Sequence, residues 1–449
     1  MEDLQVKCNE DVSIESVIDN RRKYGVHLTP INIFDEFIKP RILEKLYDHI
    51  WTDLFCGEGN LILPILSLIP RERRKEFFEK RIFLYDLQDK MVERAVENST
   101  TYGIPRKLAE KNIMVMDTLE QYPEYLIRHR KNVYHITNPP YLYLGYISKN
   151  KATSSYLNYF RDGNRGFQDL YQVAMINDLR NDIDKMAYII PSNFLFGSSV
   201  SNFIRRSFLQ DYNIEEAVVF EKKIFSHTGT NVILCFFKRS EQKNQSISFK
   251  ALKIGYQTGE RYYTLSERYG FRAGDEFEKY IKNNGKNNLR VTFYLTLNEI
   301  ESNMGNNRVV LLNSKSYSGG KYGKEEFYVN DSLYSRIKSN PLFIRTLDTG
   351  SLDGKAGLYS IGDEFGVDGI YVSGNTYRTS PIQIFLDPVP PVDKIEHVRL
   401  QFNKVLNELR EKTDSEFMTT YKYSENGQYT RKYLGLSQAR KILGTIKIN

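Results

Sequence analysis

The run Thr137-Asn138-Pro139-Pro140-Tyr141 brings together a side-chain amide, rigid backbone carbonyls and an aromatic ring. Two consecutive prolines fix φ twice and remove two N–H donors, so the carbonyls around them are held in place and can accept hydrogen bonds. Asn138 adds a side-chain carbonyl, and Tyr141 adds a face on which a flat ring can stack. This combination favours transfer of a methyl group to an aromatic amine, whose hydrogens need acceptors.

A second run, Asp53-Leu54-Phe55-Cys56-Gly57-Glu58-Gly59-Asn60, begins as a strand and ends in a Gly-X-Gly turn. The glycines allow the backbone to approach a ligand closely, and the Asp53 carboxylate can hold a ligand ammonium group. The spacing differs from a GxGxxG nucleotide loop, and no phosphate-binding lysine follows. On its own, a Gly-X-Gly turn is more often an ordinary tight turn than a ligand-binding loop.

Two further acids follow predicted strands in the same way. Asp86 stands where an acid commonly accepts hydrogen bonds from ribose hydroxyls, with Leu87 placed to pack on an adenine ring. Asp117 can accept from an adenine amino group. Each acid alone could be a helix N-cap or a surface charge. Three acids at the ends of successive strands, followed by the Pro-Pro corner, favour a nucleoside-bearing ligand.

The elements that must position these residues alternate between short apolar strands and helical stretches. Such alternation predicts an α/β fold with a doubly wound, mainly parallel sheet. Two later apolar runs have no helix between them and predict an antiparallel hairpin. The predicted strands are 50–55, 82–86, 113–116, 133–137, 186–191, 214–220 and 231–237, and helical stretches include 31–47 and 90–102.

The polar segment Ser240–Ser246 predicts a domain boundary. We therefore expect a catalytic domain over residues 1–240 and a second, α+β domain over residues 241–449. Within the second domain, the apolar spacing over 392–412 predicts one long helix with a single buried face.

Composition argues against a membrane-spanning protein and against a metal site. The chain has 449 residues, of which 41% are hydrophobic, and contains no apolar run long enough to span a membrane. Its cysteines and histidines are scattered without metal-ligand spacing, so we expect no metal and reduced thiols in the cytoplasm.

The net charge of +7 is unevenly distributed. Residues 241–449 contain 30 Lys and Arg against 24 Asp and Glu, which accounts for most of the excess. A basic half joined to a near-neutral half is typical of a polyanion-binding module attached to a catalytic one. An ordinary solvated surface explains the same numbers equally well.

With these motifs, the chain resembles the adenine-N6 DNA methyltransferases that use S-adenosylmethionine. The run 53–60 is similar to that family's cofactor loop, although Leu54-Phe55 departs from the proline found there in many relatives. Asn138-Pro139-Pro140-Tyr141 matches its catalytic tetrapeptide, and the upstream segment 23–30 resembles the one that touches the methionine end of the cofactor. The motif order resembles the gamma group, in which target recognition is C-terminal.

The resemblance implies a Rossmann-like methyltransferase fold and a set of functional residues. The segment 224–231 resembles a hairpin that supplies a second aromatic face to the target base, which assigns that role to Phe225. The implied catalytic residues are Asn138, Pro139, Pro140, Tyr141 and Phe225, and the implied cofactor-binding residues are Tyr24, Thr29, Pro30, Asp53, Phe55, Cys56, Gly57, Gly59, Asp86, Leu87, Asp117, Thr118 and Asn138.

The implied substrate is an adenine flipped out of double-stranded DNA, because an amino group inside a duplex cannot reach this corner. Tyr141 and Phe225 would sandwich the base. The tyrosine-rich and basic segment 141–165 is interpreted as a flap over the target strand, or else as a surface loop. We expect a monomer, with a separate cognate restriction endonuclease as a possible partner.

Two other interpretations remain open. A methyltransferase acting on RNA amino groups or on a protein glutamine amide faces the same geometric problem at the transferred nitrogen. A nucleic-acid-binding subunit without catalytic activity could retain the fold, although the complete tetrapeptide and the three acids favour an enzyme.

Overall fold

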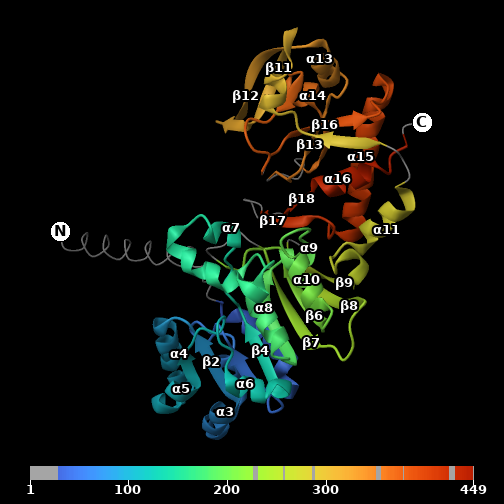
Figure 1. The fold of residues 1–449 in the computed structure, drawn as a ribbon. Helices are drawn as coiled ribbons and strands as arrows, with labels where there is room; N and C mark the ends of the chain where they lie inside the picture. Colours follow the sequence, from blue (N-terminus) through green and yellow to red (C-terminus); the bar gives the residue numbers. More distant parts are fainter. Residues whose placement is uncertain are drawn as a thin grey trace, which may run out of the picture. The chain divides into compact units, whose positions relative to one another are not determined.

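The protein divides into two compact units, residues 1–273 and 274–449, which are described separately (Figure 1). The computed structural model describes residues 29–225, 231–255, 258–285, 289–349, 355–377, 379–423 and 430–447.

Unit 1 is built on a nine-stranded sheet with the order β3-β2-β1-β4-β5-β7-β6-β8-β9. The first five strands in the chain pair in parallel, and the carboxyl ends of neighbouring strands therefore meet at one edge. This confirms the predicted doubly wound, mainly parallel sheet. The five strands are β1 (Ile50–Asp53), β2 (Ile82–Asp86), β3 (Ile113–Val115), β4 (Val133–Thr137) and β5 (Lys185–Pro191).

The predicted antiparallel hairpin is also present. Strand β6 (Tyr212–Phe220) pairs with β7 (Val232–Arg239), and β7 pairs antiparallel with β5. Two further strands, β8 (Ser246–Ile254) and β9 (Thr258–Ser266), continue the same sheet from β6.

Unit 1 therefore ends at Ala273, beyond the boundary predicted after residue 240. The polar segment at 240–246 is a turn between strands rather than a linker. Strand β8 alternates exposed and buried side chains, and Ile247, Phe249 and Ala251 join the hydrophobic core of unit 1. Period-two burial of this kind fixes a strand onto a sheet more firmly than local polarity separates it.

Two hydrophobic clusters cover the two faces of the sheet. Successive residues of one strand enter opposite clusters, as Ile50 and Trp51 do in β1 and Tyr188 and Ile189 do in β5. Helices α8 (Leu170–Arg180) and α10 (Asn202–Leu209) contribute to one cluster. Helices α3 (Arg74–Arg81) and α4 (Asp89–Thr101) contribute to the other. Figure 1 shows α4 and the neighbouring α5 (Arg106–Asn112) beside β2.

The helical stretch expected over 31–47 is irregular. It consists of a π-helical turn (Phe34–Ile38), a short α-helix α2 (Lys39–Ile42) and a 3-10 turn (Leu43–Lys45). Pro40 lies inside it and has no N–H to donate, which interrupts the regular i→i−4 ladder.

Unit 2 has an α+β architecture, as predicted. Its four-stranded sheet has the order β10-β16-β13-β14, a three-stranded sheet has the order β12-β11-β15, and β17 pairs with β18. The long helix expected over 392–412 is α15 (Val392–Thr413), which buries Val398, Phe402, Leu406 and Leu409. The strands are β10 (Arg290–Phe293), β11 (Met304–Ser318), β12 (Lys321–Val329), β13 (Leu342–Arg345), β14 (Gly357–Ser360), β15 (Gly369–Tyr371), β16 (Ile382–Asp387), β17 (Thr419–Tyr423) and β18 (Thr430–Tyr433), and the other helices of this unit include α11 (Asp275–Asn284), α13 (Asp331–Lys338) and α16 (Leu436–Leu443).

None of the helices in the described segments is long and apolar enough to cross a membrane. The same segments hold no group of three or more His, Cys, Asp or Glu side chains arranged to bind a metal ion.

Candidate active site

The glycine turn after β1 has the backbone that its sequence predicts. Gly57 and Gly59 have φ values of +54° and +83°. A Cβ on Gly59 would lie 2.5 Å from Cδ1 of Leu63, so a side chain there would require the buried Leu63 to move. The turn is held against β2 because Cys56 N–H donates to the Tyr85 carbonyl at 2.9 Å. We call residues 53–60, where the sequence predicts cofactor binding, the cofactor loop.

Asp53 links the cofactor loop to strand β4. Its Oδ1 accepts a hydrogen bond from the Thr137 hydroxyl at 2.6 Å and another from Phe55 N–H at 3.0 Å. The side chain is almost completely buried, and this desolvation raises the pKa of Asp53 to about 6. Thr137 immediately precedes Asn138, so Asp53 is fixed to the tetrapeptide 138–141, for which the sequence predicts a catalytic role and which we call the catalytic corner.

Asp86 and Leu87 lie where the sequence predicted them, at the carboxyl end of β2. The two oxygens of Asp86 accept from Gly57 N–H and Gln88 N–H, each at 2.9 Å, and burial raises the pKa of this carboxyl. Leu87 is 50% exposed. An exposed leucine beside a buried acid at a strand end can pack against a flat apolar ligand.

Asp117 follows β3 and is joined by a residue that the sequence analysis missed. Its Oδ1 accepts from Leu119 N–H at 3.1 Å, and its Oδ2 accepts from the Tyr159 hydroxyl at 2.5 Å. Burial and the bond to Asp117 together raise the pKa of Tyr159. Tyr159 comes from the 3-10 helix Lys151–Phe160, within the segment interpreted as a flap. The only indication of Tyr159 in the sequence was the high tyrosine content of that segment.

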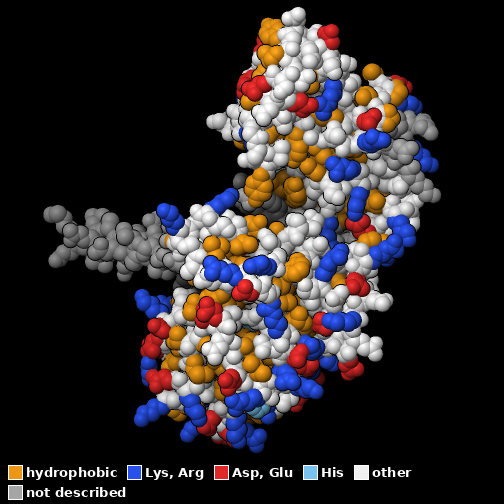
Figure 2. Space-filling model, viewed as in Figure 1, with side chains coloured by type: hydrophobic (Ala, Val, Ile, Leu, Met, Phe, Trp, Pro, Cys, Tyr) orange, Lys and Arg blue, Asp and Glu red, His pale blue; other side chains and the backbone are white. Residues whose placement is uncertain are grey.

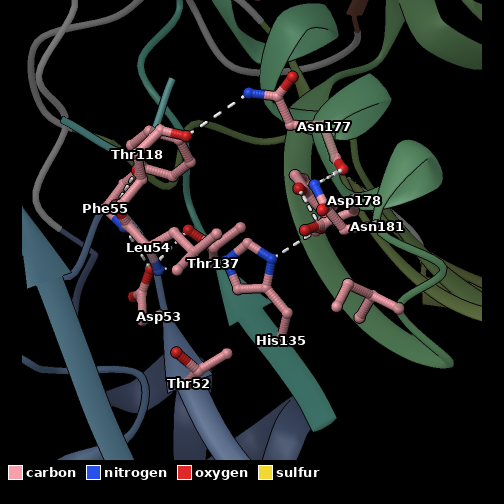
Figure 3. Close-up of polar contacts among 12 residues, drawn as sticks. Thr52, Asp53, Leu54, Phe55, Thr118, His135, Thr137, Asn177, Asp178 and Asn181 are labelled. Carbon is pink, nitrogen blue, oxygen red and sulfur yellow. Dashed lines mark hydrogen bonds and ion pairs between the residues drawn. The ribbon is translucent and has the colours of Figure 1, made fainter. Parts of the chain in front are cut away.

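Both backbone polar groups of Leu54 are held by residues outside the cofactor loop. The Thr118 hydroxyl donates to the Leu54 carbonyl at 2.8 Å, and Leu54 N–H donates to Nε2 of His135 at 3.2 Å. Nδ1 of His135 lies 2.7 Å from Oδ2 of Asp178 on α8. Figure 3 shows these contacts converging on the end of β1. The sequence analysis identified Thr118 but neither His135 nor Asp178.

The catalytic corner is oriented by two neighbours. Asn138 donates from Nδ2 to the Thr29 hydroxyl at 3.0 Å, and its Oδ1 accepts from the Tyr141 hydroxyl at 2.5 Å. The Tyr141 hydroxyl also lies 2.6 Å from the Ile189 carbonyl. Thr29 in turn accepts at its carbonyl from Asn60 Nδ2 at 3.0 Å. The structure thus joins the predicted segment at Thr29, the cofactor loop and Asn138.

The chain leaving the corner is fixed by Asp169, the residue before α8. Its Oδ1 accepts from Leu142 N–H at 2.9 Å, one residue after Tyr141. Burial raises the pKa of Asp169 to about 7. Pro139 is buried, while Pro140 and Tyr141 are partly exposed, and Pro30 is exposed.

The other predicted site residues include Tyr24, Phe225 and Cys56. Tyr24 lies outside the described residues. Phe225 is 4% exposed and belongs to a hydrophobic cluster, so its role against a target base stays a prediction. Cys56 is buried, its thiol donates weakly to the Gly57 carbonyl at 3.6 Å, and burial raises the thiol pKa well above its ordinary value.

The C-terminal basic residues 431, 432, 440 and 441 are engaged within unit 2. Lys441 pairs with Glu278 at 2.7 Å, and Arg431 donates to the Asp348 carbonyl at 2.7 Å. Arg440 lies over the Phe293 ring, and Lys432 is buried. On the face shown in Figure 2, Lys and Arg side chains are interspersed with Asp and Glu. These four residues therefore contribute to the fold of unit 2 and are not simply a solvated surface, and a role in binding a polyanion stays a prediction.

The fold and this site define a doubly wound α/β protein with acids at the ends of three successive strands beside an Asn-Pro-Pro-Tyr corner. The family model of the N-6 DNA methylases matches residues 15–325. The chain belongs to this family, which confirms the resemblance to the adenine-N6 DNA methyltransferases.

Solved structures with similarity to the chain include proteins of restriction-modification systems. A modification subunit assigned to a type I restriction enzyme of Vibrio vulnificus YJ016 is 17% identical over 62% of this chain and 57% of its own, with a TM-score of 0.40. The methyltransferase subunit of a type I system from Streptococcus thermophilus is 18% identical over 51% of this chain and 48% of its own, with a TM-score of 0.38. The type IIG restriction endonuclease BpuSI is 11% identical over 95% of this chain and 61% of its own, with a TM-score of 0.42.

The chain thus spans about half to three-fifths of the length of these proteins. No curated protein matches the sequence.

Proposed function

We propose that this protein transfers a methyl group from S-adenosylmethionine to N6 of an adenine flipped out of double-stranded DNA. One observation carries the proposal: the Thr137–Asp53 hydrogen bond of 2.6 Å joins the catalytic corner to the cofactor loop. Membership of the N-6 DNA methylase family supports the same reaction.

The residues present suit S-adenosylmethionine. Asp53 would hold the ammonium group, Asp86 the ribose hydroxyls and Asp117 the adenine amino group, with Leu87 against the adenine ring. These residues lie at the carboxyl edge of three adjacent parallel strands, where α/β sheets bind ligands. When bound, the cofactor supplies an electrophilic methyl group on a positively charged sulfur.

Asn138 and Pro139 would hold the amino group of the target. The nitrogen of an aromatic amine is a weak nucleophile because its lone pair is delocalised into the ring. If Asn138 Oδ1 and the Pro139 carbonyl accept its two hydrogens, the nitrogen moves toward tetrahedral geometry and its lone pair becomes available. Preorganised acceptors of this kind lower a barrier without a strong general base.

Tyr141 would change its hydrogen bond when the target binds. A phenol has one hydrogen, which can go to Asn138 Oδ1 or to the Ile189 carbonyl. Donation to Ile189 leaves Asn138 Oδ1 to accept from the amino group. The ring of Tyr141 would stack on the flipped base, with Phe225 as the second face, and base–aromatic stacking contributes roughly 1–3 kcal/mol.

Unit 2 would recognise the target sequence in this proposal. Its residues 274–449 form a separate compact unit after the catalytic one, as expected for a gamma-group enzyme. The protein would act in the cytoplasm as a monomer, alone or with a separate cognate restriction endonuclease.

The second candidate is a methyltransferase acting on RNA amino groups or on a protein glutamine amide. It uses the same Asn138 geometry, because an amide nitrogen is delocalised in the same way. Family membership favours DNA.

The test is transfer of labelled methyl from S-adenosylmethionine to unmethylated duplex DNA, followed by digestion to nucleosides. We expect N6-methyladenine from the wild type and from Asn32→Ala, which makes the same substitution at an exposed position, but not from Asn138→Ala. Labelled RNA or protein with unlabelled DNA would establish the second candidate. Absence of label from all three, together with absence of cofactor binding, would overturn the enzymatic function.

A further inference from the structure

The Leu54 N–H lies at the point where strand pairing between β1 and β4 stops. The last paired residues of these strands are Thr52 and His135. Beyond this pair, a buried backbone N–H needs another acceptor, since leaving it unpaired is costly. The Nε2 atom of His135 serves as that acceptor at 3.2 Å. A side chain of β4 therefore takes the place of a backbone carbonyl as the acceptor for the first peptide N–H of the cofactor loop.

The two neighbours of His135 determine its tautomer. Leu54 N–H is a donor, so Nε2 must present its lone pair. The hydrogen of the neutral ring is then on Nδ1, which donates to Asp178 Oδ2 at 2.7 Å. A protonated ring would direct a second N–H at the Leu54 N–H and break the contact.

Asp178 is built to accept this hydrogen bond. The Tyr122 hydroxyl donates to its Oδ1 at 2.7 Å, and the Tyr188 hydroxyl donates to its Oδ2 at 2.6 Å. Burial raises the pKa of both tyrosines well above the ordinary value, so both remain donors. Asp178 and His135 are both fully buried. With three donors around it, the carboxylate keeps its acceptor role toward His135 Nδ1.

We propose that His135 is a positioning residue for the cofactor loop, held by Asp178 in the tautomer that accepts from Leu54 N–H (Figure 3). This inference rests on the proposed cofactor site, because its effect is transmitted through the loop that begins at Asp53. Both ring nitrogens of His135 are engaged within the protein and the residue is fully buried, so it would act through the loop rather than on a ligand directly. It aligns the Asp53–Leu54 peptide, while Thr118 holds the carbonyl of the next peptide, Leu54–Phe55.

Two substitutions of His135 test the hydrogen bonds of its two ring nitrogens separately. In His135→Asn, the shorter amide can still donate to Asp178 near the position of Nδ1 but offers no acceptor to Leu54. In His135→Gln, the amide oxygen can reach the position of Nε2 and accept from Leu54. We expect His135→Asn to weaken binding of S-adenosylhomocysteine, measured by calorimetry, by about tenfold or more. His135→Gln should recover a substantial part of that loss.

A matched control measures the effect of lost stability alone. Asn112 is buried and donates to the carbonyls of Phe78, Glu79 and Ile82, at the end of β2 opposite the cofactor loop. Asn112→Ala should lower the thermal midpoint without changing the Kd for S-adenosylhomocysteine. If the Kd follows the thermal midpoint equally in all three variants, His135 is only structural and the inference fails.

Nitrogen-15 spectra of histidine-labelled protein provide a readout independent of ligand. The His135 resonances, assigned by their loss in His135→Asn, should be pyrrole-like at Nδ1 and pyridine-like at Nε2. The opposite tautomer or a doubly protonated ring would overturn the inference. A wild type that binds no cofactor would overturn the proposed function as well, whereas normal binding by His135→Asn would overturn this inference alone.

Discussion

At the scale of single residues, Asp53 carries an energetic cost that the proposed function would explain. An acid whose pKa is raised in the folded state binds its proton more tightly when folded, so ionisation destabilises the protein as the pH rises from about 4 to about 6. A shift from 3.8 to about 6 corresponds to roughly 3 kcal/mol. A buried carboxylate of this kind is suited to neutralising a ligand ammonium group.

We therefore predict opposite effects of Asp53→Asn on stability and on binding. Both hydrogen bonds to Asp53 end on Oδ1, an acceptor that asparagine retains. The variant should have a thermal midpoint several degrees higher at pH 7.5, little changed at pH 4, and bind S-adenosylmethionine at least tenfold more weakly. Wild-type binding should fall below pH 6. A lower midpoint at pH 7.5 would contradict the cost assigned to this carboxylate.

Tyr141→Phe should affect the chemical step more than DNA binding. The substitution keeps the ring for stacking but removes the hydroxyl that contacts Asn138 Oδ1 and the Ile189 carbonyl. We expect kcat to fall about tenfold with a small change in KM for DNA, while Tyr141→Ala should also raise KM. Equal KM values for the two variants would contradict the stacking role.

Residue types and spacing predicted the parts of the site that follow strands directly. Asp53, Asp86 and Asn138 could be found because each ends an apolar run that reads as a strand. His135 and Tyr159 could not, since one lies inside a strand and the other reaches its partner Asp117 across 42 residues of chain. Such contacts depend on three-dimensional packing, which short-range patterns do not encode.

At the scale of elements, the cofactor loop depends on a glycine with two separate constraints. We predict that Gly59→Ala is more destabilising than Gly103→Ala. Both residues have similar positive φ values, +83° and +88°, but a Cβ on Gly103 meets nothing within 4 Å. Backbone strain alone costs roughly 1–2 kcal/mol. Denaturant unfolding should show a loss of that size in the free energy of unfolding for Gly103→Ala and a larger loss for Gly59→Ala. Equal losses for the two variants would contradict an added cost from the contact with Leu63.

The same scale shows which elements a sequence can predict. Strands β2 and β4 have the predicted bounds because each is a continuous apolar run between clear breaks. The stretch at 31–47 is irregular because Pro40 has no N–H to donate. Hydrophobic periodicity detects the apolar face of the stretch but not this missing donor. The segment 141–165 includes the helix α7 (Leu144–Ile147) and a 3-10 helix, which local composition did not reveal.

At the scale of the whole molecule, the end of unit 1 can be tested by truncation. A fragment of residues 1–273 retains β8 and β9, whereas a fragment of 1–240 leaves the β6 edge of the sheet unpaired. Unpaired edges promote aggregation. We predict a soluble, cooperatively melting 1–273 fragment and an aggregating 1–240 fragment, measured by size-exclusion chromatography and calorimetry. A 1–240 fragment that is also soluble and melts cooperatively would place the boundary where the polar turn suggested.

The two buried thiols in the described part of the chain can report on motion. Cys56 lies in the cofactor loop, and Cys235 lies in β7, in the middle of the sheet. Burial raises both thiol pKa values, so an alkylating reagent reacts with either only after local exposure. Cys235 reacts only when the sheet opens, while Cys56 needs only its own loop to open. The ratio of the two alkylation rates therefore reports how often the loop opens relative to the sheet. A bound ligand should lower the rate at Cys56 and leave the rate at Cys235 unchanged.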